Sequence, residues 1–184
     1  MDWSVRHLAA VALLTGGMLA VALNSVAAEP SPKAASALVE IMKSRGLDAV
    51  AAQDPANPDH FVAAMLVPDV QLLVVAGKAT APDYLRSQIA AHQFRDVYAA
   101  LYAGAVPDTK LFFQDMGSDG LNPASGNIDI MYERGTKQTV FNGDWKGQKL
   151  SRSEYEEKQQ KADAEYSRLL ALLAEGLRTA AGGA

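Results

Sequence analysis

The amino-terminal segment decides which part of this chain can fold, because its composition differs from everything that follows. Arg6 precedes an apolar run over residues 8–23, and the small residues Val26-Ala27-Ala28 come soon after it. A weakly positive start, an apolar middle and small residues that fit a signal peptidase are the layout of a secretory signal peptide. We therefore predict that residues 1–28 are a removable export signal and that the rest of the chain is periplasmic or secreted.

The same segment has a second interpretation, as a membrane anchor that is never cleaved. The apolar run over residues 8–23 holds 16 residues, whereas a helix needs roughly 20 to span a bilayer. This difference favours cleavage, after which no stable membrane span is expected.

The remaining chain must be stabilised by burial of apolar side chains. None of the 184 residues is a cysteine, which excludes disulfides, cysteine-ligated zinc, iron–sulfur clusters and thiol nucleophiles. With 49% hydrophobic residues, the chain can still form a core. The net charge of −4 argues against a general nucleic-acid binder, since such a protein presents a basic face.

Residues 31–45 have the periodicity of an amphipathic helix. Leu38, Ile41 and Met42 fall on one stripe. Pro32 near the start and Gly46 just past the end are the residues expected at helix termini.

A long helix is predicted at the carboxyl end, beginning at a capping box formed by Ser153 and Glu156. Its apolar residues share one side: Tyr155, Ala162, Tyr166, Leu169, Leu170, Leu173 and Leu177. We expect residues 180–184 to be a flexible tail.

Several apolar segments predict antiparallel strands. Residues 61–67 and 70–76 should form a hairpin, and the second is so apolar that both of its faces should be covered. Residues 110–114, 128–132 and 138–141 predict further strands, the last two forming another hairpin. Residues 48–60, which carry two prolines, are predicted to be a loop.

Residues 80–102 carry two signals. Thr80, Pro82 and Asp83 predict the start of a helix. Further along, the density of valine and tyrosine favours a strand over residues 95–102, although the spacing of the apolar residues there also suits a helix.

This order of elements predicts the fold class. Successive strands without crossover helices between them indicate an α+β fold. We expect a single domain over residues 29–179, with a mainly antiparallel sheet or a small barrel, flanking helices and a long C-terminal helix.

The loop over residues 115–127 contains the candidate metal ligands. Asp115, Asp119 and Asn122 offer oxygen ligands among glycines, as calcium-binding loops do. An EF-hand is excluded, because Gly117 and Gly126 stand where that motif needs ligands. The interpretation that we favour is a turn in which Asp, Asn and Gly residues form local hydrogen bonds.

No catalytic arrangement is evident in the sequence. It contains no Gly-x-Ser-x-Gly motif and no glycine-rich phosphate loop. His60 and His92 cannot fill a zinc site by themselves, and we interpret them as a loop residue and a residue at the edge of the core. We therefore expect a non-enzymatic domain that binds a small molecule or an exported protein, whose identity the sequence leaves open.

Lys78, Tyr84 and Arg86 are the candidate ligand-binding residues. Lys78 ends a predicted strand and Arg86 lies in the first turns of the next helix, so the two cations and the free amides of that helix could hold a phosphate or carboxylate. Tyr84 could line the same pocket. The simpler interpretation is that the two cations are surface residues balancing an acidic protein.

The order of elements over residues 34–145 resembles the FMN-binding split barrel of the pyridoxamine-phosphate-oxidase-like proteins. The likeness is one of topology: a leading helix, an antiparallel hairpin, a helix that opens after Lys78, and further strands. It implies a six-stranded barrel, usually a homodimer, that binds FMN or a related cofactor at the subunit interface, with Lys78 and Arg86 meeting the phosphate. The alternative function is therefore a flavin- or haem-associated protein with redox activity.

Overall fold

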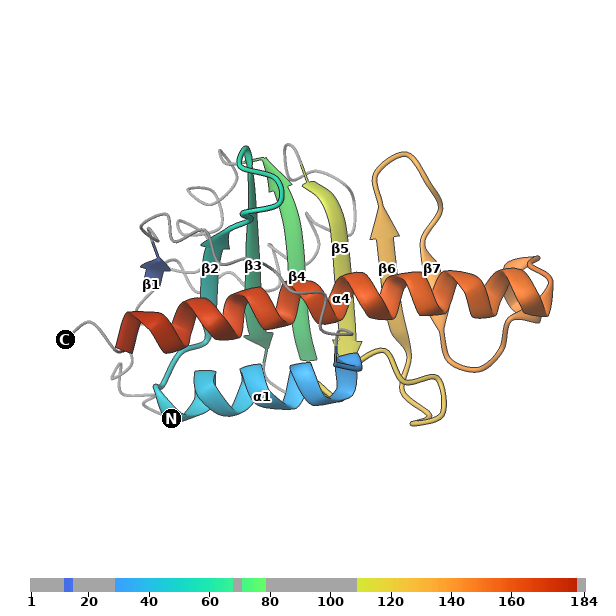
Figure 1. The fold of residues 1–184 in the computed structure, drawn as a ribbon. Helices are drawn as coiled ribbons and strands as arrows, with labels where there is room; N and C mark the ends of the chain where they lie inside the picture. The colour runs from blue at the N-terminus through green and yellow to red at the C-terminus, as the bar shows by residue number, and fades with distance from the viewer. Residues whose placement is uncertain (1–11, 15–28, 68–70, 79–108, 182–184) are drawn as a thin grey trace, which may run out of the picture.

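The computed structural model describes residues 12–14, 29–67, 71–78 and 109–181, and Figure 1 shows one sheet crossed by two helices. In chain order the elements are β1 (Ala12–Leu14), α1 (Ser31–Ser44), β2 (Ala49–Gln53), β3 (His60–Val67), β4 (Gln71–Lys78), β5 (Thr109–Met116), β6 (Asp129–Glu133), β7 (Thr139–Phe141), the short 3-10 helix η1 (Lys146–Gln148) and α4 (Arg152–Ala181). The helix predicted to begin at Thr80 and the strand predicted over residues 95–102 lie outside the described residues.

The sheet is an open meander. β2 to β7 pair antiparallel in the order of the chain, and β1 pairs with β2 in parallel. This arrangement confirms the predicted α+β fold with its long C-terminal helix. β1 belongs to the segment that we predict to be removed, and β2 to β7 form a continuous sheet without it.

The central hairpin follows from the apolar character of its strands. β3 and β4 pair from His60 opposite Lys78 to Val67 opposite Gln71, which confirms the predicted hairpin. Residues 72–77 of β4 are all buried, as expected of a strand covered on both faces.

Three predictions about local structure were wrong. Residues 49–53 form β2 and not a loop. Its first four residues are buried alanines and a valine that pair with β3, and alanine carries little strand signal of its own.

The capping box of α4 is formed by Ser151 and Glu154, two residues before the predicted pair. The Ser151 amide donates to Glu154 Oε2 at 2.7 Å, and the Glu154 amide donates to Ser151 Oγ at 3.3 Å. At its other end, α4 includes residues 180 and 181 of the predicted tail.

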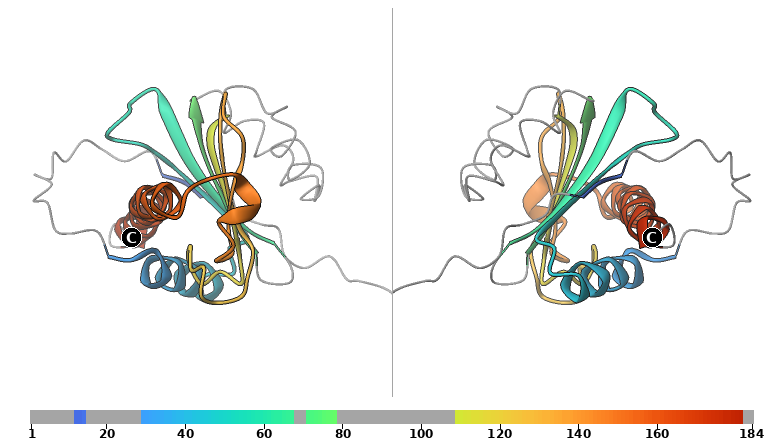
Figure 2. Two further views of the ribbon diagram at one scale, coloured as in Figure 1. Left: turned by 90° about the vertical axis from the view of Figure 1, so that its right-hand side faces the viewer. Right: turned by 90° about the vertical axis from the view of Figure 1, so that its left-hand side faces the viewer.

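The helices α1 and α4 lie on the same face of the sheet, as Figure 2 shows. α1 ends as predicted, with Gly46 at φ +64° and the Leu47 amide donating to the Met42 carbonyl at 2.9 Å. The apolar side predicted for α4 is buried along its length. Within the described parts of the chain, no helix has an apolar stretch long enough to cross a bilayer.

A side chain forms hydrogen bonds with the backbone on the outer side of the edge strand β7. The Gln148 side-chain carbonyl accepts a hydrogen bond from the Val140 amide at 2.8 Å, and its amide nitrogen donates to the Val140 carbonyl at 2.6 Å. Gln148 thus takes the place that a neighbouring strand would occupy, which protects this edge from pairing with another chain.

The loop after β5 approaches the start of α1 so closely that only glycine fits there. Gly120 has φ +80°, and a Cβ at this position would lie 2.3 Å from the backbone nitrogen of Pro32. The Leu121 amide next to it donates to Ser31 Oγ at 2.8 Å, and Ser31 Oγ donates to Asp163 of α4 at 2.5 Å. The contact therefore ties the loop to both helices.

We expect Gly120→Ala to be far more destabilising than Gly126→Ala, which is a matched control. Gly126 also has φ +80°, but a Cβ there has no atom within 4 Å. Gly126→Ala should lower the free energy of unfolding by about 1–2 kcal/mol through backbone strain alone. Gly120→Ala should cost about 1–3 kcal/mol more, because backbone atoms must move apart. Urea denaturation measures both, and equal losses would contradict the close approach.

Candidate functional site

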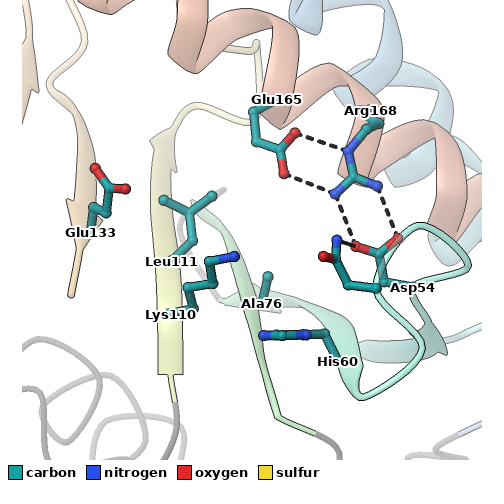
Figure 3. A pocket seen from close by; sticks show the side chains of 9 residues that line it. Asp54, His60, Ala76, Lys110, Leu111, Glu133, Glu165 and Arg168 are labelled. Atoms are coloured by element: carbon teal, nitrogen blue, oxygen red, sulfur yellow. Dashed lines mark hydrogen bonds and ion pairs between the residues drawn. The ribbon is translucent and has the colours of Figure 1, made fainter.

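A pocket of about 240 Å³ lies between α4, the β2–β3 turn and the strands β3 to β6. Figure 3 shows the side chains that line it. Most of them are charged or polar; the described lining is Asp54, Asn57, His60, Ala76, Lys110, Leu111, Glu133, Glu165 and Arg168. The helix contributes Glu165 and Arg168, which lie one turn apart on the same face.

Arg168 holds one wall of the pocket together. Its guanidinium donates to both oxygens of Asp54 at 3.0 Å, and to both oxygens of Glu165 at 2.8 and 2.9 Å. Burial alone would raise the pKa of Asp54, but hydrogen bonds from Arg168, Asn57 and the Ala56 amide outweigh burial and lower it. Arg168 is thus occupied by two carboxylates and ties α4 to the β2–β3 turn.

A β-bulge turns Lys110 toward the pocket. Ala76 of β4 pairs with Leu111, whereas the next residue, Gly77, pairs with Thr109, so that Lys110 has no partner on β4. An extra residue of this kind changes the direction in which a side chain points. Figure 3 shows Lys110 and Leu111, which are successive residues, extending to the same side of β5.

Two charged residues of the lining are not neutralised by ion pairs. Lys110 and Glu133 are exposed, and neither forms a salt bridge with any residue that the structure describes. His60, the first residue of β3, is half-buried, and its Nδ1 lies 2.7 Å from the Asp59 carboxylate. If Nδ1 carries the proton of the neutral ring, Nε2 is left as an acceptor.

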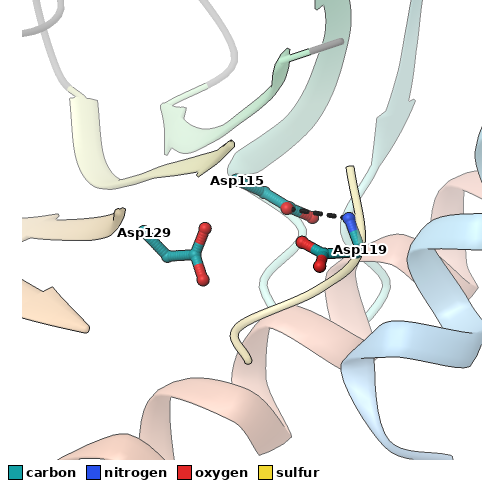
Figure 4. Close-up of side chains that lie close together, drawn as sticks. All are labelled: Asp115, Asp119 and Asp129. Carbon is teal, nitrogen blue, oxygen red and sulfur yellow. Dashed lines mark hydrogen bonds between the residues drawn. The ribbon is translucent and has the colours of Figure 1, made fainter. Parts of the chain in front are cut away.

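The second cluster consists of three aspartates at the opposite end of β5. Asp115, Asp119 and Asp129 each place a carboxylate oxygen within 4.8 Å of the others. Figure 4 shows the three side chains. Asp115 and Asp129 are fully buried and Asp119 is partly exposed. The antiparallel pairing of β5 with β6, with Gln114 opposite Ile130, brings Asp115 and Asp129 to the same place.

Backbone amides and a tyrosine hydroxyl surround these carboxylates. Asp115 accepts hydrogen bonds from the amides of Asp119 and Gly120 at 3.0 and 2.9 Å, and from the Tyr166 hydroxyl at 3.0 Å. Asp129 accepts from the amides of Met116 and Asn122 at 3.0 and 3.2 Å. The carboxylates therefore organise the loop between β5 and β6, as the turn interpretation expects.

Burial and mutual repulsion make these aspartates hold protons more tightly than usual. Burial raises the pKa of Asp115 to about 6, although its three hydrogen bonds oppose the shift. Burial and the charge of Asp115 raise the pKa of Asp129 to about 7. The pair therefore binds protons near neutral pH that the unfolded chain would release.

The predicted metal ligands meet only in part. The structure brings Asp115 and Asp119 together, but the Asn122 side-chain oxygen accepts a hydrogen bond from the Ala124 amide at 3.2 Å and so serves a local turn. Asp129, the third member of the cluster, was not among the predicted ligands. Asp129 lies in the predicted strand 128–132, but only the observed pairing of β5 with β6, which the sequence does not specify, places it opposite Asp115. Calcium binding by this loop stays a prediction.

The predicted anion site is described only at one residue. Lys78 is exposed at the end of β4, opposite His60, and does not line the pocket. Tyr84 and Arg86 lie outside the described residues, so the phosphate site and the split-barrel resemblance stay predictions. His60 begins a strand and is not a loop residue as predicted, while His92 lies outside the described residues.

Comparison with protein-family models, with curated proteins and with solved structures finds no match to this chain. The geometry of the pocket and of the aspartate cluster therefore carries the functional argument.

Arg168→Met should destabilise the protein, because it leaves the buried Asp54 carboxylate without its bidentate partner. We expect a loss of about 2 kcal/mol in the free energy of unfolding, the usual effect of losing hydrogen bonds to a charged group. Arg152→Met is the control: Arg152 pairs with Glu156 on the exposed surface of the same helix, and its loss should cost less than about 0.5 kcal/mol. Chemical denaturation that gave equal losses would contradict a structural role for Arg168.

Asp129→Asn should weaken the pH dependence of stability. In the wild type, the unfolded state releases the protons of these carboxyls near pH 4, whereas Asp115 and Asp129 retain theirs to about pH 6 and 7. The contribution of these retained protons to the free energy of unfolding is complete below pH 4 and is lost as the pH rises to about 7. Denaturation midpoints from pH 4 to 8 should therefore fall less steeply in Asp129→Asn. The exposed Asp48→Asn control should follow the wild type, and three parallel curves would refute the shifted pKa values.

Proposed function

We propose that this chain is a non-enzymatic binding domain of an exported protein, and that it holds a small polar molecule in the pocket beside Arg168. The observation that carries the proposal is the bulge at Lys110, which directs a cation that pairs with no described residue into a cavity instead of leaving it on the opposite face of the sheet. Bulges occur preferentially beside functional sites, where they change the direction of a side chain.

The wall of the pocket formed by Arg168 and its two carboxylate partners supports this proposal. Arg168 donates hydrogen bonds to Asp54 and Glu165, so these three side chains shape the pocket without needing a ligand. Lys110, Glu133 and the Nε2 atom of His60 remain to contact a guest. A few polar groups that converge on a preformed cavity are characteristic of small-molecule sites.

The size and chemistry of the pocket favour binding of a small molecule. The cavity of about 240 Å³ is slightly smaller than the roughly 300–1,000 Å³ typical of drug-sized ligand sites, which suits a guest of small-metabolite size. None of the side chains in the described lining is a hydroxyl or thiol nucleophile, so the pocket offers hydrogen bonds and charge but no group for covalent catalysis by those routes.

A screen of small polar compounds by nuclear magnetic resonance tests the proposal. Amino acids, carboxylic acids, amines and sugars are added to the labelled protein, and binders should shift the amide signals of residues 54–60, 110–111 and 165–168. Lys110→Met should weaken binding about tenfold, the effect expected from losing a hydrogen bond to a charged group. Lys137→Met, which removes an exposed lysine from the β6–β7 turn, should leave affinity unchanged. Compounds that shift signals only elsewhere, or that bind Lys110→Met normally, would refute the proposal.

A further inference from the structure

Two charged residues of the pocket, Lys110 and Glu133, pair with no residue that the structure describes; they have opposite signs and come from adjacent strands. Lys110 lies at the start of β5 and Glu133 at the end of β6, and Leu111 pairs directly with Glu133. A simple anion bound at Lys110 would be repelled by Glu133, and a simple cation bound at Glu133 would be repelled by Lys110. Only a guest with both charges is attracted by both residues.

The space between these two charges is apolar. Leu111 is half-buried and follows Lys110 on β5, and Figure 3 shows its side chain between Lys110 and Glu133. The Lys110 ammonium group turns toward Asp54 and His60, away from Glu133. A guest that reaches both charges must therefore pass over a leucine side chain, which suits a short aliphatic segment.

We infer that the ligand of this pocket is a small zwitterion with an aliphatic middle: a carboxylate that contacts Lys110, an ammonium group that contacts Glu133, and methylene groups over Leu111. The inference rests on the proposed function of the same pocket. Arg168 is not the anion-binding residue, because Asp54 and Glu165 already occupy its guanidinium. The chemical class is that of ω-amino acids and similar dipolar metabolites.

The test compares compounds that differ only in charge. Glycine, β-alanine, γ-aminobutyrate and 5-aminopentanoate are titrated into the full chain, each beside the monocarboxylate and the primary amine of the same length. At least one zwitterion should bind at least tenfold more tightly than both of its singly charged counterparts, as followed by the amide signals of residues 110–111. The length that binds best measures the separation of the two charges.

Two variants assign each end of the guest. Lys110→Met should reduce the affinity for the best zwitterion to that for the matching amine, and Glu133→Gln should reduce it to that for the matching carboxylate. Lys137→Met and Glu40→Gln remove exposed charges elsewhere and should leave every affinity unchanged. Both pocket residues are exposed, so their replacement leaves the fold intact; the midpoint of urea unfolding verifies this for each variant.

Failure of the inference is distinguishable from failure of the proposed function. If monocarboxylates or amines bind as tightly as the zwitterions, or if Glu133→Gln has no effect, the zwitterion assignment is wrong while the pocket still binds a small molecule. The zwitterion assignment is also wrong if none of this series binds but another polar compound shifts the pocket signals. If no polar compound shifts them, the binding function itself is refuted, and the inference with it.

Discussion

The packing of α4 across the sheet is the interaction on which the rest of the structure depends. A helix of 30 residues is about 45 Å long, enough to cross every strand. Tyr166, at the centre of the contact, is fully buried, and its ring centroid lies 4.7 Å from that of Phe113 on β5. Because packing fixes the position of α4 on the sheet, the polar side chains of α4 are held in definite positions near the two ends of the strands.

From this position α4 reaches both polar sites. The Tyr166 hydroxyl donates to Asp115, at the end of β5, while Arg168, two residues further along the helix, binds Asp54 in the β2–β3 turn, at the opposite end of the strands. The two sites compensate burial of charge in different ways. At Arg168, one guanidinium binds two carboxylates and leaves a net charge of −1, whereas the aspartates rely on backbone donors and on retained protons. The cluster at Arg168 leaves a pocket beside it, lined by two charges that pair with no described residue, whereas the aspartates fill their loop with hydrogen bonds.

The local structure could be predicted wherever a single segment carries its own signal. The period of the apolar residues identified α1 and α4, and the continuous apolar run identified β4, because these patterns depend on neighbours within one element. β2 was missed because its alanines and valine form a strand only when β3 pairs with them. The cap of α4 was misplaced because Ser151–Glu154 and Ser153–Glu156 have the same spacing, so the sequence pattern does not distinguish the pair that forms the box.

The sequence by itself determined the fold class, the antiparallel hairpins, the two helices with their apolar sides, and the turn character of the loop with Asp115 and Asp119. Only the tertiary structure decided which polar residues meet. Arg168 and Asp54 are 114 positions apart and Tyr166 and Asp115 are 51 apart, so no local pattern links them. The bulge at Lys110 is likewise a property of two paired strands. Residues so far apart come together because apolar burial fixes the helix on the sheet, and the polar contacts follow from that placement.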